Sequence, residues 1–290
     1  MKRWATALCG LLSLLAPYGL AQPSAWRFPP TVQAGTAFSV QTSGSGPATL
    51  YVVGTGDALQ RSVQLGQSIA FSSEDLRNAG HYVALLVAGT ETQSAQFDVV
   101  ASTQPAGLSF IAKPSRLPVN QVNGLSGVVY VLDAFRNLLV QPQRVTFELS
   151  DPSGGTQSRV ATTRNGVAWV KMNSATKAGS SQFRASSGDI RVQRAVLNVP
   201  GEPCTVKMNS HGAGQRIVLE TDPLRDCNGN AVPDGTIVTF TEVYGGQQTT
   251  VDVPLKRGVA RTELLARSRA VISVASGVVM GNEIRVSGGQ

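Results

Sequence analysis

The feature that most constrains the fold is an internal repeat in the second half of the chain. The stretch "DCNGNAVPDGTIVTF", Asp226 to Phe240, aligns with "DAFRNLLVQPQRVTF", Asp133 to Phe147, at a constant offset of 93 positions. Asp, Asn, Thr and Phe recur at matching places, and shorter matches follow downstream. Self-similarity at this distance indicates two copies of one folded unit.

The repeated unit is built from short strands. In "RVTFELS", Val145, Phe147 and Leu149 alternate with polar residues, which is typical of a strand with one buried and one solvent-exposed face. "GVAWVKM", "AQFDV" and "RAVLNV" alternate in the same way. The only helical candidate is a single turn in "SSEDLRNAG", residues 72–80. Many short strands with regular turn signals predict an all-β fold of antiparallel β-sandwiches.

Two short stretches rich in Pro and Gly, at 102–107 and 199–203, divide the chain into pieces of immunoglobulin-domain size. We therefore predict three tandem immunoglobulin-like β-sandwiches, at 22–101, 105–199 and 203–288. The first segment, 1–21, is interpreted as a signal peptide, because Lys2 and Arg3 precede an apolar run and small residues precede a cleavage site after Ala21. A retained membrane helix is the alternative, but the run is too short to span a bilayer.

A signal peptide predicts an exported chain, in the periplasm, outside the cell or at the cell surface. No later apolar run is long enough for a transmembrane anchor. Removal of Cys9 with the signal would leave Cys204 and Cys227, which an oxidising compartment favours as a disulfide. Two independent buried thiols are the alternative.

The stretch after Asp226 allows two interpretations. Oxygen-bearing side chains at Asp226, Asn228, Asn230 and Asp234 could wrap a calcium ion, or could form a polar turn that leads into a strand. In the sister copy, Phe135 and Gln141 replace two of these oxygens while the strand pattern persists. The repeat therefore favours the turn, and no metal site is predicted.

These motifs, in this order and in two successive copies, resemble the bacterial immunoglobulin-like domains of the invasin/intimin type. The resemblance covers roughly 107–199 and 203–287. It implies a Greek-key sandwich that acts as a stalk or spacer on a bacterial surface, sometimes with an adhesive tip. The first module resembles a related immunoglobulin-like sandwich, and "EDLRNAGHY" within it resembles a tyrosine corner, which implies a structural role for Tyr82.

We find no catalytic constellation and predict neither an enzyme nor a cofactor. The two histidines, His81 and His211, lie in different modules, and no second histidine or free cysteine completes a zinc set. The unusual feature is charge, because residues 101–200 carry eleven basic residues against four acidic ones. Such a surface favours an anionic polymer, although the charge could also serve only solubility. The candidate contact residues are Arg144, Arg159, Arg164, Lys171, Arg184 and Arg191.

Two functional hypotheses follow. The first is an exported, non-enzymatic structural or interaction protein of the bacterial envelope or exterior, a spacer or adhesin-like chain whose partners are envelope or surface proteins. The second is an accessory protein that binds anionic polysaccharide or another anionic polymer through the basic middle module. Aromatic residues that could stack on bases are few in that module, which argues against dedicated nucleic-acid binding.

Overall fold

The computed structural model describes residues 26–287, which form strands, turns and bends but no helix. The chain divides into two compact units, one ending at Val100 and the other beginning at Ala101. The predicted signal peptide and Cys9 lie outside the described residues.

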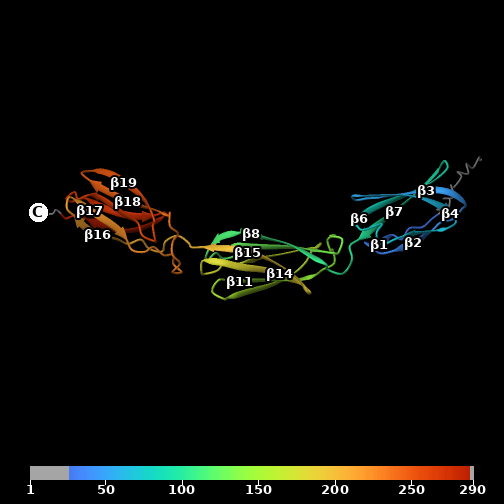
Figure 1. The fold of residues 1–290 in the computed structure, drawn as a ribbon, viewed down its shortest axis with the longest axis horizontal. Coiled ribbons are helices and arrows are strands. Elements are labelled where there is room, and N and C mark those ends of the chain that lie inside the picture. Colours follow the sequence, from blue (N-terminus) through green and yellow to red (C-terminus); the bar gives the residue numbers. More distant parts are fainter. Residues whose placement is uncertain (1–25, 288–290) are drawn as a thin grey trace, which may run out of the picture. The chain divides into compact units, whose positions relative to one another are not determined.

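The first unit contains one five-stranded and one two-stranded sheet (Figure 1). The strand order is β1-β7-β6-β3-β4 in the larger sheet and β2-β5 in the smaller. Side chains from both sheets fill the core, and Phe38 and Phe71 stack with ring centroids 4.5 Å apart. The strands are β1 (Thr31–Gln33), β2 (Phe38–Gln41), β3 (Gly46–Gly54), β4 (Asp57–Leu65), β5 (Ser68–Phe71), β6 (Gly80–Ala88) and β7 (Glu91–Val100).

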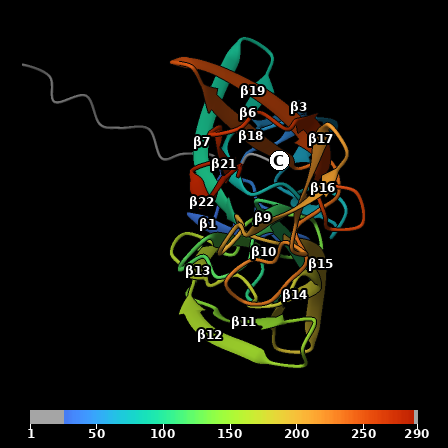
Figure 2. The same ribbon diagram turned by 90° about the vertical axis from the view of Figure 1, so that its left-hand side faces the viewer.

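The second unit begins with a sandwich of a three-stranded sheet, β13-β10-β8, and a five-stranded sheet, β12-β11-β14-β15-β9. Figure 2 shows β10 and β13 in one layer and β11 and β12 in the other. Phe110, Phe147 and Phe183 pack between the layers. The strands are β8 (Gly107–Lys113), β9 (Arg116–Pro118), β10 (Leu125–Leu132), β11 (Arg144–Ser150), β12 (Thr156–Thr162), β13 (Val167–Met172), β14 (Gly179–Ser187) and β15 (Ile190–Val199).

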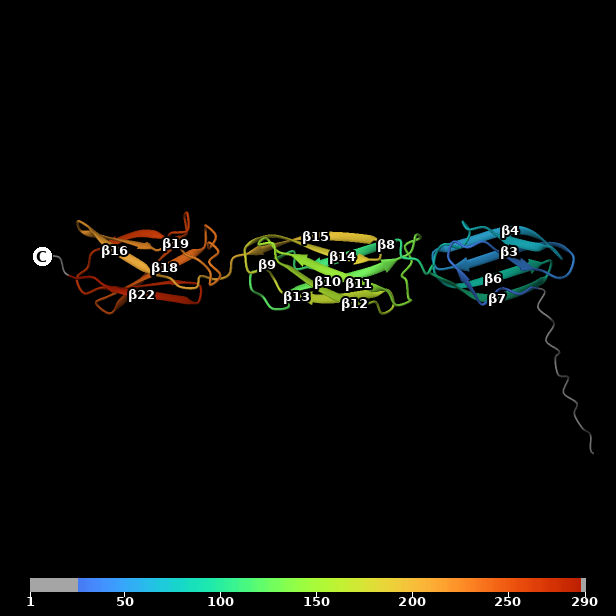
Figure 3. The ribbon, with the colours of Figure 1, turned by 90° about the horizontal axis from the view of Figure 1, so that it is seen from below.

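The same unit ends with sheets β16-β17-β20 and β19-β18-β21-β22 (Figure 3). A separate core lies between them, formed around Leu219, Phe240 and Ile272. The strands are β16 (Met208–Ala213), β17 (Arg216–Thr221), β18 (Ile237–Tyr244), β19 (Gln247–Pro254), β20 (Arg261–Leu265), β21 (Val271–Ser276) and β22 (Val279–Arg285).

The alternation read from the sequence matches the observed burial. β11 has the bounds expected for "RVTFELS", and Val145 and Phe147 are 0% exposed. Their repeat equivalents in β18, Val238 and Phe240, are also 0% exposed. The predicted internal repeat therefore extends to the residues that build the two cores.

Two details differ from the expectation of antiparallel strands and one helical turn. β1 pairs with β7, and β9 with β15, in parallel. β9 follows Pro114, which has no N–H to extend the β8 ladder, so the chain crosses to the other sheet there. The stretch 72–80 forms a single turn rather than a helix. The Asp75 N–H donates to the Ser72 oxygen at 3.2 Å, and the Leu76 oxygen accepts the Gly35 N–H at 2.8 Å.

Candidate functional site

The Asp226 turn is a buried hydrogen-bonded loop. Asp226 is 4% exposed, and its Oδ1 accepts the N–H groups of Asn228 and Asn230 at 2.9 and 2.8 Å. Its Oδ2 accepts the Asn230 side-chain amide at 2.8 Å and the Gly201 N–H at 3.0 Å. The carboxylate therefore closes the turn and also ties the chain segment between the two sandwiches to it.

The sister turn repeats this network atom for atom. Asp133 is 2% exposed, and its Oδ1 accepts the N–H groups of Phe135 and Asn137 at 2.9 and 2.8 Å. Its Oδ2 accepts the Asn137 amide at 3.0 Å and the Ser102 N–H at 3.1 Å. The Asp and Asn residues that the two copies share, four positions apart, therefore form a turn that anchors the segment preceding each sandwich.

The four oxygens considered for calcium have other partners. Asp226 accepts the donors just described, and the Oδ1 atoms of Asn228 and Asn230 accept the Asn120 amide at 3.2 Å and the Ala178 N–H at 3.0 Å. Asp234 accepts the Gly258 N–H at 2.9 Å. Within 26–287, no group of three or more His, Cys, Asp or Glu could hold a metal ion. The geometry agrees with the turn interpretation.

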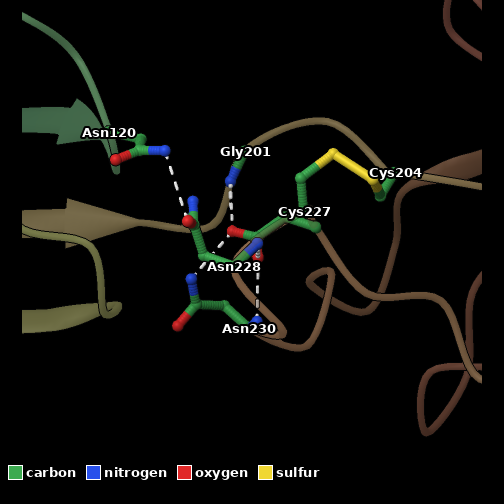
Figure 4. The surroundings of a disulfide bond; sticks show 7 residues. Asn120, Gly201, Cys204, Cys227, Asn228 and Asn230 are labelled. Carbon is green, nitrogen blue, oxygen red and sulfur yellow. Dashed lines mark hydrogen bonds between the residues drawn. A yellow bond between two sulfur atoms is a disulfide. The ribbon is translucent and has the colours of Figure 1, made fainter.

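The turn also joins the two sandwiches of the second unit (Figure 4). Lys177 donates to the backbone oxygen of Asn228 at 2.7 Å, and the Asn230 amide donates to the Thr176 oxygen at 3.1 Å. With the bonds from Asn120 and Ala178, these contacts connect the loop of one sandwich to two loops of the other. The junction is therefore held by specific hydrogen bonds in addition to the covalent linker.

Cys204 and Cys227 form a disulfide with Cα atoms 4.6 Å apart, as the sequence predicted. Cys204 lies before β16, and its N–H donates to the Arg225 oxygen at 2.8 Å. Cys227 is the first residue after Asp226. The disulfide thus attaches the segment leading into the third module to the turn that contacts the second.

The electrostatics of the turn predict an acid-sensitive stability. Burial alone raises the pKa of Asp226, but the hydrogen bonds from Asn230, Gly201 and Asn228 outweigh it, so the pKa lies below the ordinary value of 3.8. A lowered pKa in the folded state contributes stability above the unfolded value, and this contribution is lost as pH falls through the folded pKa.

Asp226→Asn should therefore lower the free energy of unfolding at pH 7 by about 1–3 kcal/mol, because an amide nitrogen would face the Asn230 and Gly201 donors. The difference from the parent chain should shrink as pH falls below 3.8. Calorimetry of the mature chain between pH 7 and pH 2.5 measures this, with Asp222→Asn as an exposed control. A constant difference across this range would contradict the assignment.

The structure does not gather the six candidate basic residues into one patch. Arg144, Arg184 and Arg191 lie on the outer face of the five-stranded sheet, and Arg184 is 3.5 Å from Glu148. Lys171 lies on the outer face of the three-stranded sheet, on the other side of the sandwich. Arg164 lies in the turn between β12 and β13.

Arg159 occupies a distinct position at the sandwich edge. It pairs with the core residue Phe147, so it points to the core side of edge strand β12, where no further strand covers it. With Lys171 and Trp169 it lines a shallow groove of about 600 Å³ along β12 and β13. Trp169 is 67% exposed. The sequence did not single out Trp169 as a site residue, although its alternation with the buried Ala168 and Val170 places it on the solvent-exposed face of β13.

Tyr82 is 0% exposed, and its hydroxyl donates to the Asn78 carbonyl oxygen, four residues upstream, at 2.9 Å. Burial, followed by the nearby Asp57 carboxylate, raises the pKa of Tyr82 to about 12. Gly54 lies directly beneath the ring, where any Cβ would overlap it. This geometry supports the structural role expected of Tyr82.

Both histidines are exposed. His81 Nδ1 lies 3.0 Å from the Asp98 carboxylate, and both side chains are exposed. His211 lies in β16. No helix among residues 26–287 is long and apolar enough to cross a membrane.

No protein-family model and no curated protein matches this chain. Among solved structures, invasin, a bacterial integrin-binding protein, is similar with a TM-score of 0.50 and 12% identity, over 89% of this chain and 57% of invasin. The FN1–FN3 domains of chicken CNTN1 show a TM-score of 0.38 and 12% identity, over 90% of this chain and 96% of theirs.

The chain therefore has an invasin-like organisation of tandem immunoglobulin-like β-sandwiches, and the predicted all-β fold is confirmed. At 12% identity the likeness concerns the fold alone, and this chain spans little more than half of the invasin structure. The module limits 22–101, 105–199 and 203–288 stay predictions.

Proposed function

We propose that this protein is an exported, non-enzymatic structural or interaction protein of the bacterial envelope or exterior. Its tandem modules act as a spacer or adhesin-like stalk, and its partners are envelope or surface proteins. The disulfide between Cys204 and Cys227 supports export, because such bonds persist in oxidising compartments.

The observation that carries this proposal is the junction in the second unit. A protein that only needed three independent domains could join them by free linkers. Here a buried carboxylate holds the Gly201 N–H, and Asn228 and Asn230 bond to loops of the preceding sandwich. A junction held in this way suits a chain that keeps modules at a defined separation.

Export is tested by expressing the full chain with a carboxy-terminal tag in a bacterial host and sequencing the amino terminus of the product. We expect a mature chain beginning at Gln22, found outside the cytoplasm, with no free thiol by intact mass. A product that keeps Met1 and stays in the cytoplasm would overturn the proposal.

The junction is tested by replacing Asn228 and Lys177 with alanine in one variant. This removes the bonds from Asn120 and Lys177 but keeps the Asn230 contacts that close the turn. Spin labels placed at Ser158 and Thr250 as unnatural amino acids should show a broader distance distribution than in the parent chain. Lys207→Ala with Gln248→Ala is the surface control, and an equally broad distribution in the parent would contradict a held junction.

A further inference from the structure

The outer face of the three-stranded sheet in the second module carries an exposed apolar row. Ile111, Val128 and Trp169 stand directly opposite one another on β8, β10 and β13. Directly paired residues point to the same face of a sheet. Trp169 is 67% exposed and Ile111 44% exposed, so the row is open to solvent.

A row of cations borders these apolar side chains. Two residues further along β8 and β13 from the apolar row, Lys113 and Lys171 lie on either side of Ser126 of β10. Arg159 of the edge strand β12 lies beside β13 and lines the groove with Trp169, Lys171 and Asn123.

The cations on this face lack acidic neighbours. No ion pair joins Lys113, Lys171 or Arg159 in the part of the chain that the structure describes. Strands β8, β10, β12 and β13 contain no Asp or Glu. By contrast, the outer face of the other sheet contains Glu148 beside Arg184. The positive field on the Trp169 face is therefore not neutralised locally.

We propose that this face, defined by Trp169, Ile111, Lys113, Lys171 and Arg159, binds an acidic polysaccharide. The proposal rests on the interaction role proposed above and adds to its protein partners a polysaccharide ligand. An exposed indole offers a flat apolar surface to the C–H face of a sugar ring, and Lys and Arg pair with carboxylate or sulfate groups. The apolar row and the cation row lie two residues apart along the same strands.

Other occupants fit the same face less well. A second copy of the chain would bring its Lys113 and Lys171 against the same cations, which costs energy. A single nucleic-acid strand is bound by successive aromatic rings, one for each base. Only one aromatic side chain on this face, Trp169, is largely exposed, since Tyr130 in the next row is half-buried.

The test titrates the purified mature chain with polygalacturonate, with neutral dextran and single-stranded DNA as comparison polymers. Trp169 reports its own binding site, because the other indole of the described residues, Trp26, is only 2% exposed. We expect a blue shift of the exposed indole emission with polygalacturonate, weaker at high salt, and no shift with dextran.

Trp169→Ala should lower the affinity for polygalacturonate about tenfold, and Trp169→Tyr should retain most of it. Lys113→Glu with Lys171→Glu should lower it by on the order of tenfold or more. Arg144→Glu with Arg191→Glu makes the same charge change on the opposite sheet and should stay within about twofold. Circular dichroism checks that every variant is folded.

If the two double charge reversals lowered the affinity for polygalacturonate equally, the attraction would depend on net charge alone, and the proposal would be overturned. So would no binding of polygalacturonate, equal binding of dextran, or tighter binding of DNA than of polygalacturonate. Because the titration uses purified chain, its failure is distinguishable from a failure of export, which only the amino-terminal sequencing measures.

Discussion

Phe240→Ala should lower the free energy of unfolding of the third module by about 3–5 kcal/mol, whereas Asp234→Ala should have a far smaller effect. Phe240 is 0% exposed and lies on central strand β18, with Val251 and Val274 opposite it on the neighbouring strands. Its removal leaves a cavity that three strands border. Asp234 is exposed, and its carboxylate accepts hydrogen bonds only from backbone N–H groups of the neighbouring turn, at Arg257 and Gly258.

Calorimetry of the mature chain, in EDTA and in millimolar calcium, measures both variants. Phe147→Ala, at the equivalent position of the second module, should shift the transition of that module instead. A calcium-dependent rise in melting temperature that Asp234→Ala abolishes would contradict the turn interpretation and restore the metal site as the explanation.

Replacing Cys204 and Cys227 together with serine should lower the free energy of unfolding of the third module by about 3 kcal/mol. The bond closes a loop with a sequence separation of 23 residues, and without it the unfolded chain gains the conformational freedom of that loop. Because Cys227 adjoins Asp226, the variant should also weaken the turn that holds Gly201.

Chemical denaturation of the oxidised, reduced and doubly substituted chains measures this effect. The reduced parent and the variant should agree with each other and fall below the oxidised parent. Equal stability of all three chains, or a free thiol in the exported protein by intact mass, would show that the disulfide does not contribute in this way.

The strands were predictable because burial in a sheet follows a period of two along the sequence. Val145 and Phe147 alternate with polar residues, and a strand places both on one face, whereas a helix would place them on nearly opposite faces. The repeat at 133 and 226 was equally informative, since the Asp and Asn residues shared by the two copies form the same three hydrogen bonds within each turn. The single turn expected at 72–80 is present, closed by the Asp75 N–H and the Ser72 oxygen, but it does not extend into a helix, since the Leu76 oxygen accepts the Gly35 N–H.

By itself, then, the sequence determined the all-β class, the tandem modules, the disulfide partners and the buried side of the clearly alternating strands, such as β11, β13 and β18. These depend on local periodicity and on a count of two cysteines. Only the tertiary structure decided that Arg184 faces Glu148 while Lys171 lies on the opposite sheet, and that Arg159 meets Trp169 at an edge. Strand pairing and sheet assignment are set by contacts between distant segments. The net charge of a sequence sums all basic residues, whereas a ligand contacts only the basic residues that lie on one face of the folded domain.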